Sequence, residues 1–359
     1  MSSRCAARSI VVRLDANSKI GSGHAMRCLS VVAEMEALGA EVVFAVSDDE
    51  SAEFVEARGG MVHVLGGAWS ELGDEDAIAL ARFCHERDAV ALLVDTYAAT
   101  LQFFEQLRER LDEAIRVAYI DDLYAFDTGR QNYPLKLDVD AVVNYGFGAS
   151  REVYRAVYES SVDLLIGPSF APVRPSFKVI ARNRTGAFQR VLVTAGSTNP
   201  YQALERMVEG VLAVLPDACI DVVQGPLADF DLPGLSIDQV HIRKGVRDLA
   251  PLMQRADLAV SAAGSTLYEL ACAGVPTLAC PIVENQIPNA VGYGCSGAGR
   301  ALTTLSWGSK DVADRLSALL AEPDFAHMPH MGRKLVDGQG ASRIANYLLG
   351  CAPIGRKVD

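Results

Sequence analysis

The stretch SIVVRLDANSKIGSGHAMRCLSVVAEMEALG, residues 9–39, predicts a strand, a turn and a helix in succession. A β-branched apolar run ends at Leu14, and apolar residues then recur at helical spacing up to a closing glycine. Two further glycines, Gly21 and Gly23, separate the two patterns. His24 is therefore expected in the first turn of a helix, close to the carboxyl end of a strand.

Strand and helix patterns alternate along both halves of the chain. Short β-branched runs separated by helical patterns are typical of a parallel sheet with both faces covered. In the first half the predicted strands are 9–14, 41–46, 61–65, 89–95 and 115–121. In the second half they are 190–196, 219–225, 239–243, 257–264 and 275–281. The sequence thus predicts an α/β protein with two Rossmann-like domains.

A proline-containing segment separates the two halves. The run LLIGPSFAPVRPSFKVIARNRTGAFQ, residues 164–189, holds three prolines and ends in a basic, loop-like stretch. We predict an N-terminal domain with the histidine turn at 1–172 and a linker at 173–188. A C-terminal nucleotide-binding domain follows at 189–340, and a C-terminal helix with a tail at 341–359. Two such domains imply a central cleft, because ligands of parallel sheets bind beyond the carboxyl ends of the strands.

The composition is that of an acidic globular chain. Its 359 residues carry a formal net charge of -12 at pH 7. We expect no nucleic-acid or anionic-membrane partner, because both require a concentrated positive surface. No apolar run approaches the roughly 20 residues that cross a bilayer, so we expect no membrane span and a cytoplasmic location. The eight cysteines form no C-x-x-C pair, which favours neither a zinc site nor a disulfide framework.

Three glycine-containing turns follow predicted strands, at 21–23, 194–200 and 261–270. Each can hold a phosphate at a helix N-terminus or simply cap that helix, since Ser and Thr beside glycine serve both purposes. None matches the P-loop or the dinucleotide-binding G-x-G-x-x-G pattern, so ATP and NAD are not favoured. In the last turn a serine and a threonine can contact a diphosphate, and Glu269 can accept hydrogen bonds from sugar hydroxyls.

The histidines, tyrosines and acidic pairs offer further candidates. His24 follows Gly-x-Gly at a strand end, and its ordinary pKa near 6.5 suits a general base. Tyr97 of VDTY follows another strand and is expected to face the same binding cleft as His24. The acidic pairs at 121–122 and 138–140 flank predicted strands, where Asp more often forms a turn than binds a metal. We therefore predict neither a metal nor a cofactor.

Several stretches taken together resemble a known family. They are RLDANSKIGSGHAMRCLSVVAEMEALGAEVVF, LLVDTY, VAYIDDL, LLIGPSFAPVRPSF, VTAGSTNP, SAAGSTLYELACAGVPTLACP, ENQ and VDGQGASRIA, in this order along most of the chain. The set resembles the UDP-2,4-diacetamido-2,4,6-trideoxy-β-L-altropyranose hydrolases of pseudaminic acid biosynthesis, a nonulosonic acid pathway. Relatives of that family include spore-coat polysaccharide proteins and, more distantly, the N-acetylglucosaminyltransferase that makes lipid II.

The resemblance implies a glycosyltransferase-B-like fold in which the C-terminal domain holds most of the nucleotide. It also implies an inverting hydrolase that releases UDP without a metal, with water activated by a histidine. Carried onto this chain, the catalytic residues are His24 and Tyr97. The implied substrate contacts are Asp15, Gly21, Gly23, Arg27, Asn285 and Gln286. The implied nucleotide contacts are Gly196, Ser197, Gly264, Ser265, Thr266 and Glu269.

The sequence leaves the reaction open. A glycosyltransferase of the same fold would use His24 to deprotonate an acceptor hydroxyl, and a non-catalytic nucleotide-sugar-binding protein would need neither His24 nor Tyr97. The family's GG[ST]DP loop reads GSTNP here, at 196–200, and residues 124–137 resemble an insertion. We therefore expect a UDP-sugar as the small-molecule partner, with the exact sugar and the oligomeric state open.

Overall fold

The computed structural model describes residues 8–17, 19–21, 23–98, 100–121, 134–178, 188–226, 228, 230 and 238–351. The chain separates into two compact units. Unit 1 comprises Met1–Tyr145, Ala149–Pro172 and Gln339–Asp359, and unit 2 comprises Gly146–Gly148 and Val173–Gly338. Each unit has its own parallel sheet and its own hydrophobic core.

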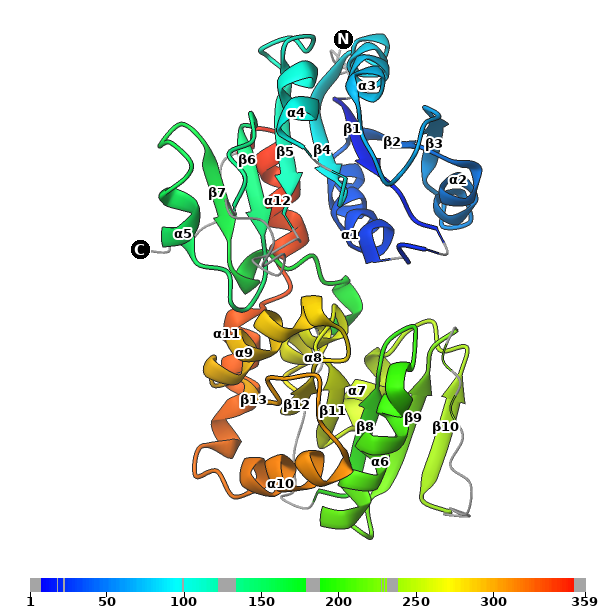
Figure 1. Cartoon of the computed structure of the whole chain (residues 1–359), viewed down its shortest axis with the longest axis vertical. Helices are drawn as coiled ribbons and strands as arrows, with labels where there is room; N and C mark the ends of the chain where they lie inside the picture. Colours follow the sequence, from blue (N-terminus) through cyan, green and yellow to red (C-terminus); the bar gives the residue numbers. More distant parts are fainter. Residues whose placement is uncertain are drawn as a thin grey trace, which may run out of the picture. The chain divides into compact units, whose positions relative to one another are not determined.

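Unit 1 is built on a sheet that has seven strands in the described residues, in the order β3-β2-β1-β4-β5-β6-β7 (Figure 1). The strands are β1 (Ser9–Leu14), β2 (Glu41–Val46), β3 (Met61–Val64), β4 (Ala89–Asp95), β5 (Arg116–Ile120), β6 (Ala141–Asn144) and β7 (Asp163–Ile166). All neighbouring strands are parallel. β1 is buried along its whole length, which explains why its residues are apolar apart from Ser9 and Arg13.

Helices cover both faces of this sheet. α3 (Asp74–Glu86) and α4 (Leu101–Arg108) pack together over the cluster that contains Val11 and Val94. On the other face α1 (Gly23–Ala37) packs against α12 (Gly340–Leu348), drawn in red in Figure 1. The described part of unit 1 also contains α2 (Asp49–Glu56), α5 (Arg151–Arg155) and the 3₁₀ turn η1 (Pro168–Phe170).

Unit 2 repeats this plan with six strands in its described part, in the order β10-β9-β8-β11-β12-β13. The strands are β8 (Arg190–Thr194), β9 (Cys219–Gln224), β10 (Val240–Lys244), β11 (Leu258–Ala262), β12 (Thr277–Cys280) and β13 (Gly299–Ala301). All neighbours are again parallel.

The helices of unit 2 flank its sheet (Figure 1). They are α6 (Ala203–Val214), α7 (Ala250–Arg255), α8 (Thr266–Ala273), α9 (Ile287–Cys295), α10 (Ser309–Leu320) and α11 (Met328–Leu335), with 3₁₀ turns η2 (Pro175–Phe177), η3 (Pro200–Gln202), η4 (Glu284–Gln286) and η5 (Phe325–His327). α10 packs so closely on α6 that a Cβ on Gly210 would collide with Val312. The α6–α10 pair thus covers the hydrophobic core on one face of the unit 2 sheet.

The predicted fold class is confirmed, because both units are parallel α/β sheets. All ten predicted strands are present. The sequence analysis does not predict β6, β7 and β13, whose three or four residues are too short to show a period. In each sheet the strand order reverses, between β1 and β4 in unit 1 and between β8 and β11 in unit 2. Open α/β sheets bind ligands beyond the strand ends at such switch points.

The segment predicted as a linker is partly folded onto unit 2. Residues 173–178 belong to that unit, and the side chain of Phe177 is completely buried there. Residues 179–187 lie outside the described residues, as does the 122–133 stretch that holds Asp122 and most of the insertion-like segment.

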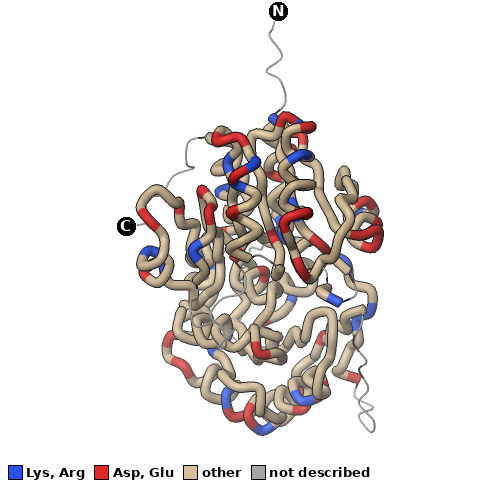
Figure 2. The backbone as a smooth tube through the Cα atoms, turned by 45° about the horizontal axis from the view of Figure 1, so that its top comes forward, with Lys and Arg blue, Asp and Glu red and all other residues tan. Residues whose placement is uncertain are grey.

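The described helices are all too short or too polar to span a bilayer. Basic and acidic residues are interspersed along the backbone of the described residues in both units (Figure 2).

Candidate active site and nucleotide site

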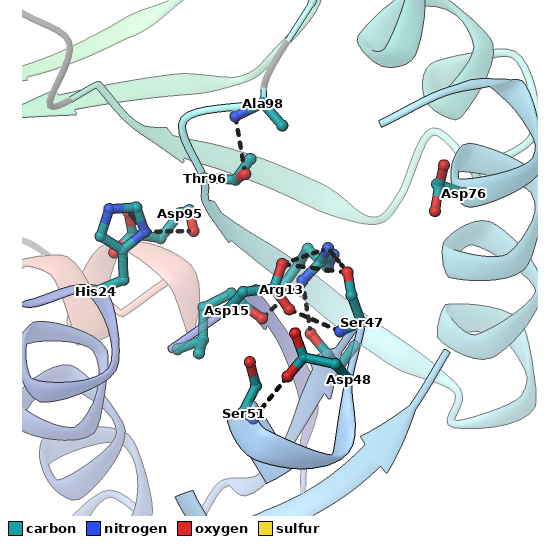
Figure 3. Close-up of polar contacts among 12 residues, drawn as sticks. Arg13, Asp15, His24, Ser47, Asp48, Ser51, Asp76, Asp95, Thr96 and Ala98 are labelled. Carbon is teal, nitrogen blue, oxygen red and sulfur yellow. Dashed lines mark hydrogen bonds and ion pairs between the residues drawn. The ribbon is translucent and has the colours of Figure 1, made fainter. Parts of the chain in front are cut away.

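His24 lies at the switch point of unit 1. It is the second residue of α1, so its predicted position in the first turn of a helix is confirmed. Its ring is 2% exposed and lies beside the carboxyl end of β4, which neighbours β1 in the sheet. Nδ1 of His24 is 3.2 Å from the main-chain oxygen of Asp95 and 3.4 Å from Oδ1 of the same residue (Figure 3).

These contacts select one tautomer of His24. A carbonyl oxygen and an ionised carboxylate only accept hydrogen bonds, so Nδ1 carries the proton and donates it. The lone pair of the neutral ring then resides on Nε2. A ring held by its Nδ1–H, with its lone pair on Nε2, has the arrangement that general-base histidines use. Nε2 itself is buried in this structure.

Asp95 is the centre of a buried charge cluster. Its side chain is completely buried and receives a bidentate contact from Arg27, with Nε 2.6 Å from Oδ2 and Nη2 2.5 Å from Oδ1. Cys28 Sγ also donates to Oδ2, at 3.3 Å. Burial alone would raise the pKa of Asp95, but Arg27, His24 and the hydrogen bonds outweigh it and hold that pKa below the ordinary value. Asp95 is therefore an anion that holds both Arg27 and His24 in place.

Arg27, predicted as a substrate contact, is thus engaged inside the protein. Besides Asp95, its Nη1 donates to the hydroxyl of Tyr145 at 2.9 Å, and its side chain is 9% exposed. Tyr97 lies with its ring edge-on to the His24 ring, the ring centres 4.3 Å apart. Tyr97 therefore lies beside His24 at the same edge of the sheet, as the sequence predicts. The catalytic role of each residue stays a prediction.

The loop after β1 is held by side chains from the start of α2. Asp15 pairs with the buried guanidinium of Arg13 at 2.8 Å and accepts from the backbone and hydroxyl of Ser47 (Figure 3). Asn17 donates to Asp48, which in turn caps α2. The carboxylate of Asp15, predicted as a substrate contact, thus already serves Arg13 and Ser47.

The two glycines of this loop leave open space. Gly21 has a φ of +76°, a left-handed conformation that favours glycine, and its N–H bonds to the carbonyl of Asn17. A Cβ on Gly21 or Gly23 would meet no atom within 4 Å. A ligand can therefore approach the backbone here, as the predicted role of both glycines in substrate binding requires.

A cavity of about 70 Å³ lies beside His24. Its lining comes from the loop after β1, from α1, from the loop after β4 and from the connection between β3 and α3. The residues are Asp15, Ile20, His24, Trp69, Ser70, Thr96, Tyr97 and Ala98. Thr96 Oγ1 accepts from the N–H of Ala98 at 3.0 Å and so turns the chain after β4 (Figure 3). Three stretches that are distant in the sequence, at 15–24, 69–70 and 96–98, therefore build one site.

Two predicted turns lie together at the switch point of unit 2. Gly196 and Ser197 follow β8, while Gly264, Ser265 and Thr266 follow the neighbouring strand β11 and begin α8. Ser265 makes no side-chain capping bond, so it does not cap α8 as the sequence allows. The N–H groups of Leu267 and Tyr268 donate instead to the carbonyls of Gly264 and Ser265. The positive end of the α8 dipole, reached over a glycine, still suits an anion site.

Glu269, predicted to accept from sugar hydroxyls, is paired with Arg174. The guanidinium Nη2 lies 3.2 Å from Oε1, and Arg174 also stacks on the ring of Phe177 at 5.0 Å. Burial raises the pKa of Glu269, and Arg174 only partly offsets this rise. Arg174 lies in the segment predicted as a linker, so its contact with Glu269 is a feature that only the tertiary structure reveals.

The turn before α8 is braced by Asn289. Its Nδ2 donates to the carbonyl of Ala263 at 2.8 Å, and its Oδ1 accepts from the hydroxyl of Tyr268 at 2.7 Å. Phe147, which belongs to unit 2, stacks on Tyr268 with ring centres 4.9 Å apart and donates its N–H to Asn289. The main chain immediately before Gly264 is therefore fixed by an amide and two aromatic rings.

The two predicted residues of the ENQ motif differ in their surroundings. Gln286 Oε1 accepts from the N–H of Ile282 at 3.0 Å, and its Nε2 would lie 3.3 Å from a Cβ on Gly264. Asn285 is exposed in η4. Gln286 is thus brought beside the glycine turn, which favours a role at the nucleotide, whereas its predicted contact with the sugar stays untested.

Of the acidic residues predicted to form turns rather than metal sites, Asp138 and Asp140 contact Arg108, and Asp121 accepts from the hydroxyl of Tyr154 at 2.7 Å. Arg108 Nη2 lies 2.6 Å from Oδ2 of Asp140, and its Nε lies 3.9 Å from Asp138. Asp140 also accepts the N–H of Val117. Among the described residues, no group of three or more His, Cys, Asp or Glu side chains is arranged to hold a metal ion.

Sequence reasoning missed several residues at these sites. Asp95 ends an apolar strand, Trp69 and Ser70 lie in a glycine-rich connection, and Arg174 and Asn289 lie outside any quoted glycine turn. For Asp95 a signal was available, since a charged residue directly after a buried strand at the switch point is positioned for a ligand. The other four lie in segments whose contacts no local pattern predicts.

Comparison with known proteins identifies the fold. The structure is similar to that of Acinetobacter baumannii MurG, with a TM-score of 0.67, 13% sequence identity, and coverage of 96% of this chain and 99% of MurG. It is also similar to the calicheamicin glycosyltransferase CalG4, with a TM-score of 0.64, 14% identity, and coverage of 96% and 98%. The chain has the glycosyltransferase-B fold.

The sequence relatives agree with this fold. The chain is 26% identical over 230 residues to the spore coat polysaccharide biosynthesis protein SpsG of Bacillus subtilis, covering 58% of this chain and 64% of SpsG. It is 28% identical over 171 residues to the UDP-N-acetylglucosamine–N-acetylmuramyl-(pentapeptide) pyrophosphoryl-undecaprenol N-acetylglucosamine transferase of Pseudomonas fluorescens, covering 43% and 46%. The matched region thus spans less than two thirds of these curated relatives. No protein-family model matches the chain.

The comparisons support part of the predicted family resemblance. A spore-coat polysaccharide protein and an N-acetylglucosaminyltransferase are among the relatives, as predicted. The specific resemblance to the pseudaminic acid hydrolases stays a prediction.

Proposed function

We propose that this glycosyltransferase-B-fold protein transfers a sugar from a UDP-sugar to an acceptor hydroxyl in the synthesis of a surface polysaccharide or glycan. One observation carries the proposal most strongly, the His24–Asp95 pair buried at the floor of a cavity at the switch point of unit 1. The functions for which the relatives are named, polysaccharide biosynthesis and N-acetylglucosamine transfer, point the same way.

In the proposed reaction His24 acts as the base. Nε2 accepts the proton of the acceptor hydroxyl while that oxygen attacks the anomeric carbon, and the bond from this carbon to the UDP oxygen breaks. The imidazolium that forms is stabilised by the ionised Asp95 at its Nδ1–H. A single displacement of this kind inverts the configuration at the anomeric carbon. UDP is a good leaving group, so stabilising its charge matters more than protonating it.

Unit 2 is proposed to bind the nucleotide. The N–H groups at the start of α8 and the turn at Gly196 can bind diphosphate oxygens, and an acidic protein can supply this positive potential from its backbone. Glu269 is proposed to accept hydrogen bonds from the ribose hydroxyls. Arg174, paired with Glu269 at 3.2 Å, orients that carboxylate.

Hydrolysis of the UDP-sugar is the second candidate, because the cavity beside His24 can hold water. Its volume of about 70 Å³ is ample for a water molecule beside the base. In this reaction His24 would deprotonate a water molecule held in the cavity. The predicted substrate is then a UDP-linked 2,4-diacetamido-2,4,6-trideoxy sugar.

One assay separates the two candidates. UDP release is measured from UDP-N-acetylglucosamine and from UDP-2,4-diacetamido-2,4,6-trideoxy-L-altrose, with and without a panel of methyl glycosides as acceptors. Transfer predicts release that depends on an acceptor and yields a disaccharide, whereas hydrolysis predicts release without one. In both cases His24→Ala is expected to lower turnover by about 10²- to 10⁴-fold, the scale of a lost general base.

The matched control is His85→Ala, because His85 is exposed on α3 and lies outside the cavity lining. It is expected to keep wild-type turnover. Full activity of His24→Ala would contradict the role of His24 in either reaction.

A further inference from the structure

The cavity beside His24 has a buried floor and an accessible rim. His24 and Asp15 are each 2% exposed and Thr96 is 5% exposed, so these three form the floor. Trp69 and Tyr97, by contrast, are half-buried lining residues. Ser70 is exposed, and Ile20 and Ala98 are half-buried. Two aromatic side chains and a hydroxyl therefore surround the entrance to the catalytic pair.

The rim residues Trp69 and Ser70 lie at the tip of a braced turn. An antiparallel bridge joins Ala68 to Glu71, which places the two rim residues between the bridged positions. Gly67, with a φ of +93°, lies so close to α3 that a Cβ on it would be 2.5 Å from Asp76 Oδ1.

The same Asp76 also fixes the far end of the connection. Its Oδ2 accepts from the N–H of Gly73 at 2.9 Å, directly before α3. The connection between β3 and α3 thus passes close to Asp76 before its tip and is hydrogen-bonded to Asp76 after it. A tip that is fixed in this way keeps Trp69 and Ser70 at the entrance.

The arrangement of the cavity restricts how a sugar can reach His24. The polar groups Asp15, His24 and Thr96 lie at the buried floor, whereas Trp69 and Ser70 are the more accessible lining residues at the rim. A sugar that places a hydroxyl or its anomeric carbon near Nε2 of His24 must therefore rest its ring on the rim. The C–H face of a pyranose is apolar and packs on aromatic rings, while its hydroxyls require polar partners.

We propose that Trp69 and Ser70 bind the pyranose ring that reacts at His24, with Trp69 under its C–H face and Ser70 bonded to a hydroxyl. The identity of this ring as a reactant rests on the proposed function. The ring belongs either to the UDP-sugar or to the acceptor, and both sources offer the same chemistry. Trp69 and Ser70 are therefore residues that select the sugar.

Tryptophan fluorescence tests the proposal, because the chain contains two tryptophans. Trp307 lies in unit 2, is 6% exposed, and donates its Nε1–H to the carbonyl of Pro281. Trp69 lies on the rim, so a ring stacked on it changes its emission. The full-length protein and its Trp69→Phe variant are titrated with UDP, UDP-N-acetylglucosamine and methyl N-acetyl-β-D-glucosaminide.

The expected result is a saturable change of emission with at least one of the two pyranose-bearing probes. This change exceeds the change caused by UDP and is lost in Trp69→Phe. A response to UDP-N-acetylglucosamine assigns the ring to the donor, and a response to the methyl glycoside assigns it to the acceptor. Trp69→Ala and Ser70→Ala are each expected to raise KM for that substrate, Trp69→Ala by about tenfold, with a smaller change in kcat.

The result that overturns the proposal is His24-dependent UDP release with no Trp69-dependent emission change and with KM unchanged in Trp69→Ala. Failure of the proposed function has a different signature, which is Trp69-dependent binding of a pyranose without His24-dependent UDP release. Trp69→Ala and Ser70→Ala each change a partly or fully exposed residue on the rim, so both variants are expected to fold. Circular dichroism checks this.

Discussion

The two switch points of this protein are built in opposite ways. At the end of β4 in unit 1, His24, Arg27 and Asp95 are buried, and both His24 and Arg27 are bonded to Asp95. At the end of β11 in unit 2, Ser265 is exposed, Gly264 is half-buried, and the available groups are largely backbone N–H groups. A base must be held in one tautomer and orientation by side chains, whereas a diphosphate is bound by a helix terminus that glycine leaves accessible.

This contrast predicts that the two sites fail differently when they are changed. A substitution in the buried cluster of unit 1 is expected to affect stability and turnover together. A substitution beside the turn of unit 2 is expected to affect nucleotide affinity while the fold persists. The predictions below test this difference, from the largest expected effect to the smallest.

Asp95→Asn is expected to produce the largest loss. The substitution leaves the buried guanidinium of Arg27 without its carboxylate, so the free energy of unfolding falls by about 3–5 kcal/mol. Urea denaturation measures this change. Asp138→Asn is the matched control, because Asp138 is 60% exposed and its contact with Arg108 is 3.9 Å long; its expected loss is below about 1 kcal/mol. Equal losses in both variants would show that Asp95 does not hold unit 1 together.

Asn289→Ala is expected to have an intermediate effect that is confined to unit 2. Loss of the hydrogen bonds to Ala263 and Tyr268 frees the main chain before Gly264, so UDP affinity falls by up to about tenfold. Isothermal titration calorimetry with UDP measures the affinity. Asn289→Asp sharpens the test, because it keeps the accepting oxygen for Tyr268 and loses the donor to Ala263.

His24→Ala is the control from the other unit for this measurement. It is expected to bind UDP with wild-type affinity although its turnover is lost. If His24→Ala weakens UDP binding as much as Asn289→Ala does, the proposed division of work between the units is wrong.

The smallest expected effect is an opposite pH dependence of stability at the two sites. The pKa of Asp95 is lowered in the folded protein, so its contribution to stability is present above the unfolded value near 4 and is lost as the pH falls through the folded pKa. The pKa of Glu269 is raised, so its contribution is largest at low pH and is lost as the pH rises from about 4 through the folded pKa.

Thermal unfolding between acid and neutral pH measures both slopes. Each variant is compared with the wild type over the same pH range. Asp95→Asn is expected to weaken the rise of stability with pH, and Glu269→Gln is expected to weaken a fall. Changes of the same sign in both variants would contradict the assigned pKa directions.

Local patterns were sufficient for ten of the thirteen strands in the described residues and for the position of His24. β1 is apolar apart from Ser9 and Arg13, and β4 is apolar up to Asp95, because both faces of these strands are covered, and such runs are visible in the sequence. The predicted glycine turns also lie at strand ends, since a parallel sheet places every turn of this kind at one edge. The roles predicted for Arg27 and Asp15 as substrate contacts had no such support, and both side chains are engaged by neighbours inside unit 1.

The sequence by itself determined two parallel α/β sheets and the segments at their carboxyl edges, because periodicity and glycine placement act over a few residues. Tertiary structure alone decided which side chains meet there. Asp95 lies 71 residues after His24, and Glu269 lies 95 residues after Arg174. Such pairs depend on strand order and register, which bring β4 beside β1 and fold residues 173–178 onto α8. No local pattern carries that information, and the chemistry of both sites depends on it.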